Sequence, residues 1–185
     1  MENYRININY AKALFLVASD SGVLDTVNND MRLVADTCNT NRILNTVFAN
    51  PVIPEHRKTA VLRDLFGERV DKVSMMFMEF VVRKRRTVNL RGIADAFVQL
   101  YRDSKGIVLS HLVTATPVTD EVKLAVENKV SAFTHKKVEL ESEVDPSILG
   151  GMSITFDGNM YDARISTAVA ELRKEFSKNA YESKL

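Results

Sequence analysis

The stretch Val144–Ile165, VDPSILGGMSITFDGNMYDARI, carries the densest set of turn signals in the chain. Its double glycine, Gly150-Gly151, leads into an alternating apolar run, and glycine tolerates backbone conformations that other residues avoid. The pair Asp157-Gly158 is a strong hairpin signal, and Asp162 has the side chain of a helix N-cap. The stretch therefore predicts a sharp turn into a strand, a hairpin, and a helix that follows Asp162.

Two ligand-binding interpretations of this stretch fail on residue spacing. A phosphate loop needs a lysine and a hydroxyl residue after its glycines, whereas Gly150-Gly151 is followed by Met152. A calcium loop that began at Asp157 would need glycine at its sixth position and glutamate at its twelfth, where this chain has Asp162 and Ala168. We therefore expect a structural motif that binds no cofactor.

Alternating patterns around this stretch predict a small α+β unit. The segment Ile107–Ala115 is rich in β-branched residues, and Val138–Val144 alternates strictly between apolar and acidic side chains. Thr119 is placed to cap a helix between these two strands, and Ile165–Phe176 has the periodicity of a final amphipathic helix.

The residues before this unit predict a helical bundle. Six segments carry helical spacing or a helix-start signal. The first has the stripe Tyr10, Ala13, Leu14, Val17 and Ala18, and the last has Ile93, Ala96, Phe97, Leu100 and Tyr101. The four between them are Leu24–Cys38, Arg42–Phe48, the residues after Pro54, and Asp71–Arg85. The predicted fold is mostly α: an N-terminal six-helix bundle, residues 1–105, followed by a small C-terminal α+β domain, residues 106–185.

Composition and residue spacing argue against several classes of function. The single cysteine, Cys38, lies on an apolar helical face, and the three histidines, His56, His111 and His135, are isolated from one another. No apolar run approaches the ~20 residues of a membrane span. We therefore expect no catalytic, metal or cofactor site and no direct membrane insertion.

The basic run Arg83–Arg86, RKRR, has two interpretations. It could belong to a helical RNA-binding module. It could instead complement the dipole at the C-terminal end of the fifth helix. The second interpretation is favoured because no aromatic residues interleave with the run to stack on bases.

Two helices carry more apolar residues than one core-facing stripe needs. The first has a second stripe of Ile8, Ala11 and Phe15, and the fifth has a second stripe of Met75, Met78 and Val82 beside Val73, Met76, Phe77, Phe80 and Val81. A helix that is apolar all round is either central in its bundle or covered by a partner. Both explanations remain open on sequence, and the second would create a docking groove for an amphipathic helix.

Several motifs together resemble a known family. NYAKALFLVA, NPVIPEHRK, FVVRKRRTVNLRGIADAFVQLY, VTATPVTDE and VDPSILGGMSITFDGNMYDARISTAVAELRKEF occur in this order over almost the whole chain. They are similar to the delta subunits of F-type ATP synthases, the counterparts of the mitochondrial oligomycin-sensitivity-conferring protein. The pattern Asp145-Pro-x-x-x-Gly150-Gly151 with a downstream Asp162 is the most specific motif. Arg164, where the family often has serine, and Lys84, where it frequently has asparagine, are departures.

The resemblance implies a non-catalytic stator subunit that couples proton-driven rotation to ATP synthesis. It further implies that the bundle grips N-terminal helices of the alpha subunits, that the C-terminal domain joins the b subunits of the peripheral stalk, and that no nucleic acid is bound. The complex would lie at the cytoplasmic face of the bacterial inner membrane, with this subunit peripheral. By this analogy the alpha-subunit contacts would be Ile8, Ala11, Phe15, Met75, Met78 and Val82, with Arg85 and Arg86 as rim charges.

Overall fold

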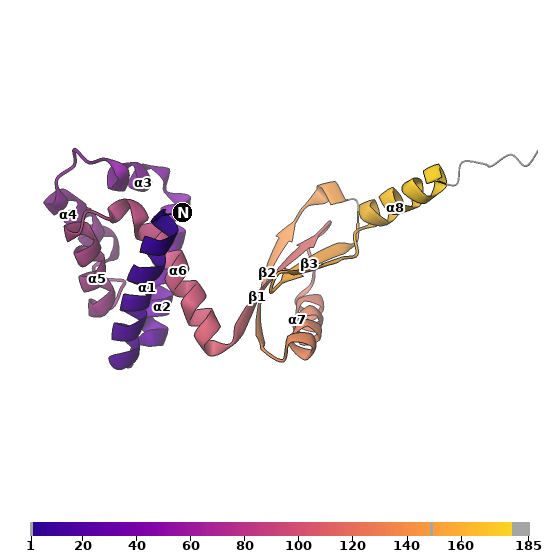
Figure 1. Ribbon diagram of the computed structural model, residues 1–185, viewed down its shortest axis with the longest axis horizontal. Coiled ribbons are helices and arrows are strands. Elements are labelled where there is room, and N and C mark those ends of the chain that lie inside the picture. The colour runs from indigo at the N-terminus through magenta and orange to yellow at the C-terminus, as the bar shows by residue number, and fades with distance from the viewer. Residues whose placement is uncertain (1, 149, 179–185) are drawn as a thin grey trace, which may run out of the picture. The chain divides into compact units, whose positions relative to one another are not determined.

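The computed structural model describes residues 2–148 and 150–178, with side chains over 4–148 and 150–177 (Figure 1). The chain divides into two compact units, Met1–Ser104 and Lys105–Leu185. The first unit is helical and the second combines a four-stranded sheet with helices. The predicted fold class, a helical bundle followed by a small α+β domain, is confirmed.

Each of the six predicted helices is present in the first unit. In chain order they are α1 (Glu2–Asp20), α2 (Leu24–Thr40), α3 (Arg42–Ala49), α4 (Glu55–Phe66), α5 (Lys72–Arg83), the short 3-10 helix η1 (Thr87–Asn89) and α6 (Leu90–Lys105). Side-chain caps define two of the starts: Asn41 accepts a hydrogen bond from the backbone N–H of Leu44 at 3.1 Å, and Asp71 accepts one from Val73 at 2.8 Å.

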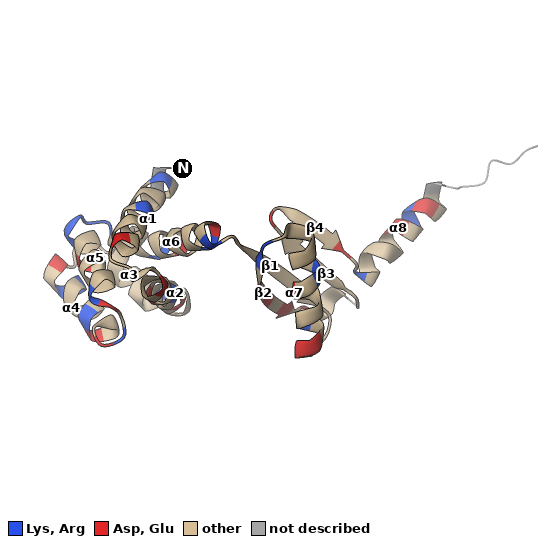
Figure 2. Ribbon diagram, turned by 90° about the horizontal axis from the view of Figure 1, so that it is seen from below, with Lys and Arg blue, Asp and Glu red and all other residues tan. Residues whose placement is uncertain are grey.

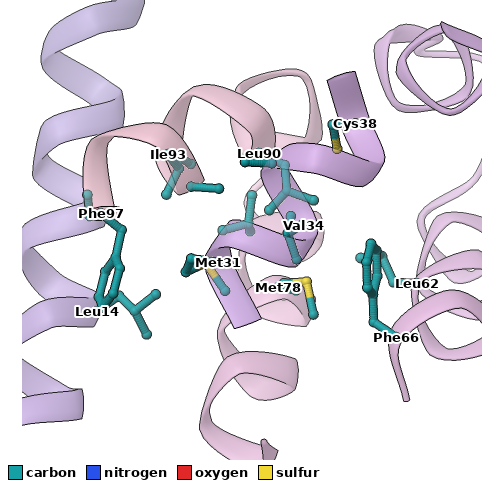
Figure 3. Close-up of a cluster of buried hydrophobic side chains, with 14 of the residues drawn as sticks. Leu14, Met31, Val34, Cys38, Leu62, Phe66, Met78, Leu90, Ile93 and Phe97 are labelled. Carbon is teal, nitrogen blue, oxygen red and sulfur yellow. The ribbon is translucent and has the colours of Figure 1, made fainter. Parts of the chain in front are cut away.

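The core of the first unit lies where these helices meet. Figure 3 shows side chains from several helices converging on one cluster, among them Leu14, Met31, Val34, Cys38, Leu62, Phe66, Met78, Leu90, Ile93 and Phe97. Cys38 is fully buried, as its place on the apolar face of α2 predicts. Burial raises the pKa of its thiol to about 11, so this cysteine behaves as a small apolar residue.

A buried carboxylate ties α2 to the start of α5. Asp30 accepts hydrogen bonds from the hydroxyl of Ser74 at 2.6 Å and from the backbone N–H of Asp71 at 2.9 Å. Both Asp30 and Ser74 are buried. This link is not predictable from the sequence, because nothing in the local pattern distinguishes Asp30 from a solvated helical aspartate.

The second unit is a sheet with one crossover helix. Its elements are β1 (Ile107–Thr114), α7 (Asp120–Thr134), β2 (Lys137–Val144), the 3-10 helix η2 (Pro146–Ile148), β3 (Met152–Phe156), β4 (Asn159–Asp162) and α8 (Ile165–Lys178). The strand order is β2-β1-β3-β4, in which β1 and β2 are parallel and the other pairs are antiparallel. Helix α7 connects the parallel pair and packs its buried Val126 and Val130 with Leu112 and Ile154. Thr119 occupies the N-cap position of α7 but makes no side-chain cap hydrogen bond.

The glycine-rich stretch forms the predicted turn and hairpin. Gly151 has φ +83°, and a Cβ placed there would collide with the carbonyl oxygen of Ala163. Asp157 and Gly158, with φ values of 46° and 77°, form the left-handed turn between β3 and β4. Gly151 therefore allows the segment before α8 to pass close to its backbone, and Gly158 allows the chain to reverse between β3 and β4.

Two aspartates hold the two ends of this stretch. Asp145 accepts a hydrogen bond from the backbone N–H of Ser147 at 2.9 Å, and hydrogen bonding from Ser147 lowers the pKa of the Asp145 carboxyl. Asp162 accepts from the Arg164 guanidinium at 2.6 and 2.9 Å, from the Arg164 backbone N–H at 2.9 Å and from the Thr167 hydroxyl at 2.9 Å. These bonds, those from the Arg164 side chain above all, hold the pKa of Asp162 well below its usual range. Asp162 thus fastens the start of α8 mainly through Arg164 and Thr167, instead of capping the first-turn amides.

Candidate partner-binding surface

Three of the residues expected on a docking surface are buried in the core of the first unit. Ala11 and Met78 have no exposed area, and Val82 is 1% exposed. The expectation that these side chains face a partner is wrong. They lie on the faces of α1 and α5 that pack inward, and Met78 sits in the central cluster of Figure 3.

The remaining members of the expected α1 stripe face α6. Ile8 lines a cavity of about 530 Å³ together with Ala96 and Leu100 of α6. The ring of Phe15 lies 6.1 Å from the ring of Phe97, also on α6. Both residues are half-buried. The stripe of Ile8, Ala11 and Phe15 is therefore the side of α1 that packs on the bundle, and a partner role for Ile8 and Phe15 stays a prediction.

The opposite side of α1 is apolar and uncovered. The stripe that was expected to face the core divides into two parts: Leu14 and Ala18 are buried, whereas Ala13 and Val17 are exposed, Val17 by 52%. Tyr10 is half-buried between these two parts. At 100° per residue, Tyr10, Ala13 and Val17 lie within one narrow sector of the helix.

Helix α5 likewise exposes part of the stripe that was expected to face the core, whereas Val81 of that stripe is buried. Met76 is 68% exposed and Phe80 is 40% exposed, although both were expected in the core. Met75 is half-buried and packs at the edge of the core cluster. The uncovered side of α5 thus carries Met76 and Phe80, one helical turn apart.

The uncovered sides of α1 and α5 meet. The rings of Tyr10 and Phe80 lie 6.2 Å apart and are tilted by 41°. Asn7, nearer the start of α1, accepts a hydrogen bond from Asn89, beyond the end of α5, at 2.9 Å. Helix α1 thus contacts α5 through Tyr10 and contacts η1, which follows α5, through Asn7.

We call this apolar region the α1–α5 surface. It consists of Tyr10, Ala13 and Val17 on α1 and Met76 and Phe80 on α5. Lys84 places its ammonium 5.5 Å from the centre of the Phe80 ring, a cation–π arrangement at the rim. The arrangement can bury apolar side chains of another molecule and supplies one nearby cation.

The two arginines expected at the rim differ in their surroundings. Arg85 places its Nε 2.9 Å from Oε1 of Glu55 on α4 and lines a cavity beside α3 and α4. Its guanidinium is thus engaged with α4. Arg86 is exposed, and its role at a partner interface stays a prediction. Figure 2 shows basic and acidic residues interspersed along the helices of this unit.

The second unit has apolar surface of its own. A cavity of about 620 Å³ lies between α7 and the β3–β4 hairpin and is lined mainly by apolar side chains, including Val122, Phe133, Met160 and Tyr161. Helix α8 has an apolar face that is exposed along its length, formed by Ile165, Val169, Leu172 and Phe176. The final amphipathic helix is confirmed, and its apolar face has no cover within the described residues.

Within residues 2–148 and 150–178, no group of three or more His, Cys, Asp or Glu side chains is arranged to hold a metal ion. None of the helices in that part of the chain combines the length and apolarity of a bilayer-spanning segment.

Known proteins resemble the chain over nearly its full length. The family model described as "ATP synthase delta (OSCP) subunit" matches residues 6–176. Relatives named "ATP synthase subunit delta" include one from Chlorobium luteolum, 33% identical over 168 residues that cover 91% of this chain and 93% of the relative. Another, from Flavobacterium johnsoniae, is 32% identical over 177 residues that cover 96% of this chain and 99% of the relative.

A solved structure shares the fold. A chain in the cryo-EM structure of the Toxoplasma gondii mitochondrial ATP synthase hexamer matches with a TM-score of 0.70 and 22% identity, covering 92% of this chain and 97% of that one. The order of helices and strands, the glycine-rich stretch and the full-length match lead to one assignment. The chain belongs to the ATP synthase delta (OSCP) subunit family.

Proposed function

We propose that the α1–α5 surface binds an amphipathic N-terminal helix of an ATP synthase alpha subunit. As a member of its family, the chain is a non-catalytic stator component of F-type ATP synthase. The observation that carries the proposal is the junction of Tyr10 with Phe80, which joins two exposed apolar helix faces into one surface. A helix in a groove or on a two-helix face buries such stripes in a common mode of recognition.

The surface suits an attachment that must persist under torque. Buried apolar anchors account for most of the binding energy at protein interfaces and slow dissociation. Full burial of a side chain such as that of Val17 or Met76 contributes about 1.5–3 kcal/mol. A cation at the rim, such as Lys84, contributes mainly to orientation and association rate.

The proposal extends to the second unit, which would join the b subunits of the peripheral stalk. The support is the exposed apolar face of α8 together with the apolar cavity beside α7. Through these partners the chain would lie at the cytoplasmic face of the bacterial inner membrane. In that position it would hold the catalytic head still while the rotor turns.

The RNA-binding alternative gains no support from the surroundings of the basic run. Lys84 lies over Phe80 and Arg85 pairs with Glu55, so two of the four cations have contacts within the bundle. The ring of Phe80 contacts the Lys84 ammonium and the Tyr10 ring. No aromatic residue interleaves with Arg83–Arg86 in the sequence, so the run lacks the row of stacking rings that single-strand binders use.

A titration of the full chain with a synthetic N-terminal peptide of the matching alpha subunit tests the proposal. Val17→Asp and Met76→Asp should each weaken binding at least about tenfold, because an unpaired carboxylate would be buried at the interface. Ile43→Asp is the matched control, since Ile43 is 77% exposed on α3 and lies outside the surface. Unchanged affinity in both test variants would refute the proposed site.

A further inference from the structure

A second cavity in the first unit has the features of an anion-binding site. Its volume is about 780 Å³, and it lies where the end of α3, the loop before α4, the start of α4 and the end of α5 meet. Its lining residues include Phe48, Ile53, Glu55, Lys58, Arg85 and Val88. We call it the α3–α4 cavity.

Lys58 brings a buried positive charge to this cavity. The residue is only 7% exposed, and its ammonium donates a hydrogen bond to the carbonyl oxygen of Phe48 at 2.9 Å. An ammonium has three donors, so one neutral acceptor leaves donor capacity for another group. No carboxylate among the described residues pairs with Lys58. Buried charges are ordinarily paired because desolvation without a counter-charge is costly.

Arg85 brings a second cation to the edge of the same cavity, from an unusual backbone position. Its φ of 57° lies in the left-handed region, which non-glycine residues seldom adopt. At this point of the chain its N–H donates to the carbonyl of Val82 at 2.8 Å, in a helix-ending turn that glycine would form with less strain. The Arg85 side chain, 86% exposed, reaches Glu55 at the start of α4.

The charges around the cavity do not cancel. Lys58 and Arg85 face one carboxylate, that of Glu55. The first turn of α4 also begins here without a side-chain cap, so its N-terminal dipole adds to the positive potential. The uncompensated charge is that of Lys58, which is itself buried.

Apart from His56 and Thr87, the rest of the lining is apolar. Phe48, Pro51, Ile53 and Val88 contribute to the walls, and Val88 is 62% exposed. An inorganic anion would satisfy Lys58 but would leave these side chains uncovered. A ligand that combines a carboxylate with apolar groups would satisfy both parts.

We propose that the α3–α4 cavity binds a glutamate or aspartate side chain flanked by apolar residues in a peptide segment of a partner protein. The carboxylate accepts hydrogen bonds from Lys58 and Arg85, and the flanking side chains cover Ile53 and Val88. This site is separate from the α1–α5 surface, and it stands whether or not that surface binds an alpha-subunit helix.

Titration of the full chain, followed by amide NMR signals, tests the site with three probes: acetyl-Leu-Glu-Leu-amide, its isosteric Gln counterpart, and inorganic phosphate. The Glu peptide should shift signals of residues 48–58 and 82–88 saturably and bind at least about tenfold more tightly than the Gln peptide, as expected for a charge-assisted contact at a buried cation. Equal affinities for the two peptides, or no saturable binding, would overturn the proposal. Phosphate binding as tight as that of the Glu peptide would also overturn it, because the site would then recognise a small anion.

Variants separate binding from folding. Lys58→Met keeps the aliphatic stem and should abolish the preference for Glu over Gln. Because this variant also loses the bond to Phe48, Arg85→Gln provides a second test at an exposed side chain and should weaken the Glu peptide about threefold to tenfold. Arg83→Gln, at an exposed cation outside the cavity lining, should leave affinity unchanged.

Arg85→Gly should raise the unfolding temperature, because glycine relieves the left-handed backbone, and should at the same time weaken binding. A purely structural arginine would not produce these opposite effects on stability and on binding.

Discussion

The ring of Tyr10 on α1 lies 6.2 Å from the ring of Phe80 on α5, so the two helices share one exposed apolar surface. Each helix also buries a second apolar stripe, represented by Ala11 and Met78. The structure thus separates the stripe that stabilises the bundle from the stripe that is available to a partner. Substitutions on the buried stripe should lower stability, whereas substitutions on the exposed stripe should weaken partner binding.

Met78→Ala and Met76→Ala form a matched pair on α5. Met78→Ala should lower the free energy of unfolding by about 2–5 kcal/mol, because it leaves a cavity in the core. Met76→Ala should change stability by less than about 0.5 kcal/mol, because Met76 is 68% exposed. Denaturant unfolding of the full chain measures both. Equal losses of stability would contradict the assignment of faces.

Asp30→Ala should destabilise the first unit by about 1–3 kcal/mol, because the Ser74 hydroxyl and the Asp71 N–H would lose their buried acceptor. Asp36→Ala, at an exposed position of the same helix, is the control and should have little effect. Chemical denaturation monitored by helical circular dichroism provides the comparison. If the Asp30 and Asp36 variants were equally stable, the link between α2 and α5 would carry no net stabilisation.

Gly151→Ala should destabilise the second unit more than Gly158→Ala does. Both glycines have positive φ, so each alanine would incur backbone strain of about 1–2 kcal/mol. Only at position 151 would the added Cβ also collide with the carbonyl of Ala163, whereas no atom lies within 4 Å at position 158. Unfolding followed by NMR signals of β3 measures the difference. Equal losses would show that the close approach of the segment before α8 is not needed.

Asp162 should make the stability of the second unit depend on acid. Hydrogen bonds from Arg164 hold the pKa of the native carboxyl below its ordinary value, which is about 3.9 in an unfolded chain. The unfolded chain therefore binds more protons as the pH falls below about 4, and the stabilisation present at neutral pH is lost progressively. Thermal unfolding at pH 7 and pH 3, again followed in the second unit, should show a smaller acid effect in Asp162→Asn than in the parent chain.

The control for this measurement is Glu121→Gln, which removes an exposed carboxylate at the start of α7. That variant should keep the acid dependence of the parent chain. A loss of acid dependence in both variants would assign the effect to general charge repulsion instead of the bonds around Asp162.

Helical periodicity predicted the elements well but not which side of a doubly apolar helix faces inward. On α1, the stripes through Tyr10 and through Ala11 are both apolar, and only packing against α2 and α6 distinguishes them. The small side chain of Ala11 gave no sign of its burial, yet small residues permit close helix approach. On α5, the large exposed side chains of Met76 and Phe80 had the appearance of core residues.

Long-range polar contacts were also outside the reach of local patterns. The bond of Asp30 to Ser74 joins residues on different helices, and the buried Lys58 reaches the end of the preceding helix at Phe48. By contrast, the turn around Gly151, the hairpin at Gly158 and the helix after Asp162 were predictable, because each depends on residues adjacent in sequence.

Photo-crosslinking in the assembled ATP synthase tests whether the α1–α5 surface holds the alpha subunit. Benzoylphenylalanine placed at position 76, on the α1–α5 surface, should crosslink to the alpha subunit on irradiation, whereas the same residue at position 43 on α3 should not. Crosslinking to alpha from position 43 with none from position 76 would refute this site, because the exposed face of α5 would then not be where the catalytic head is held.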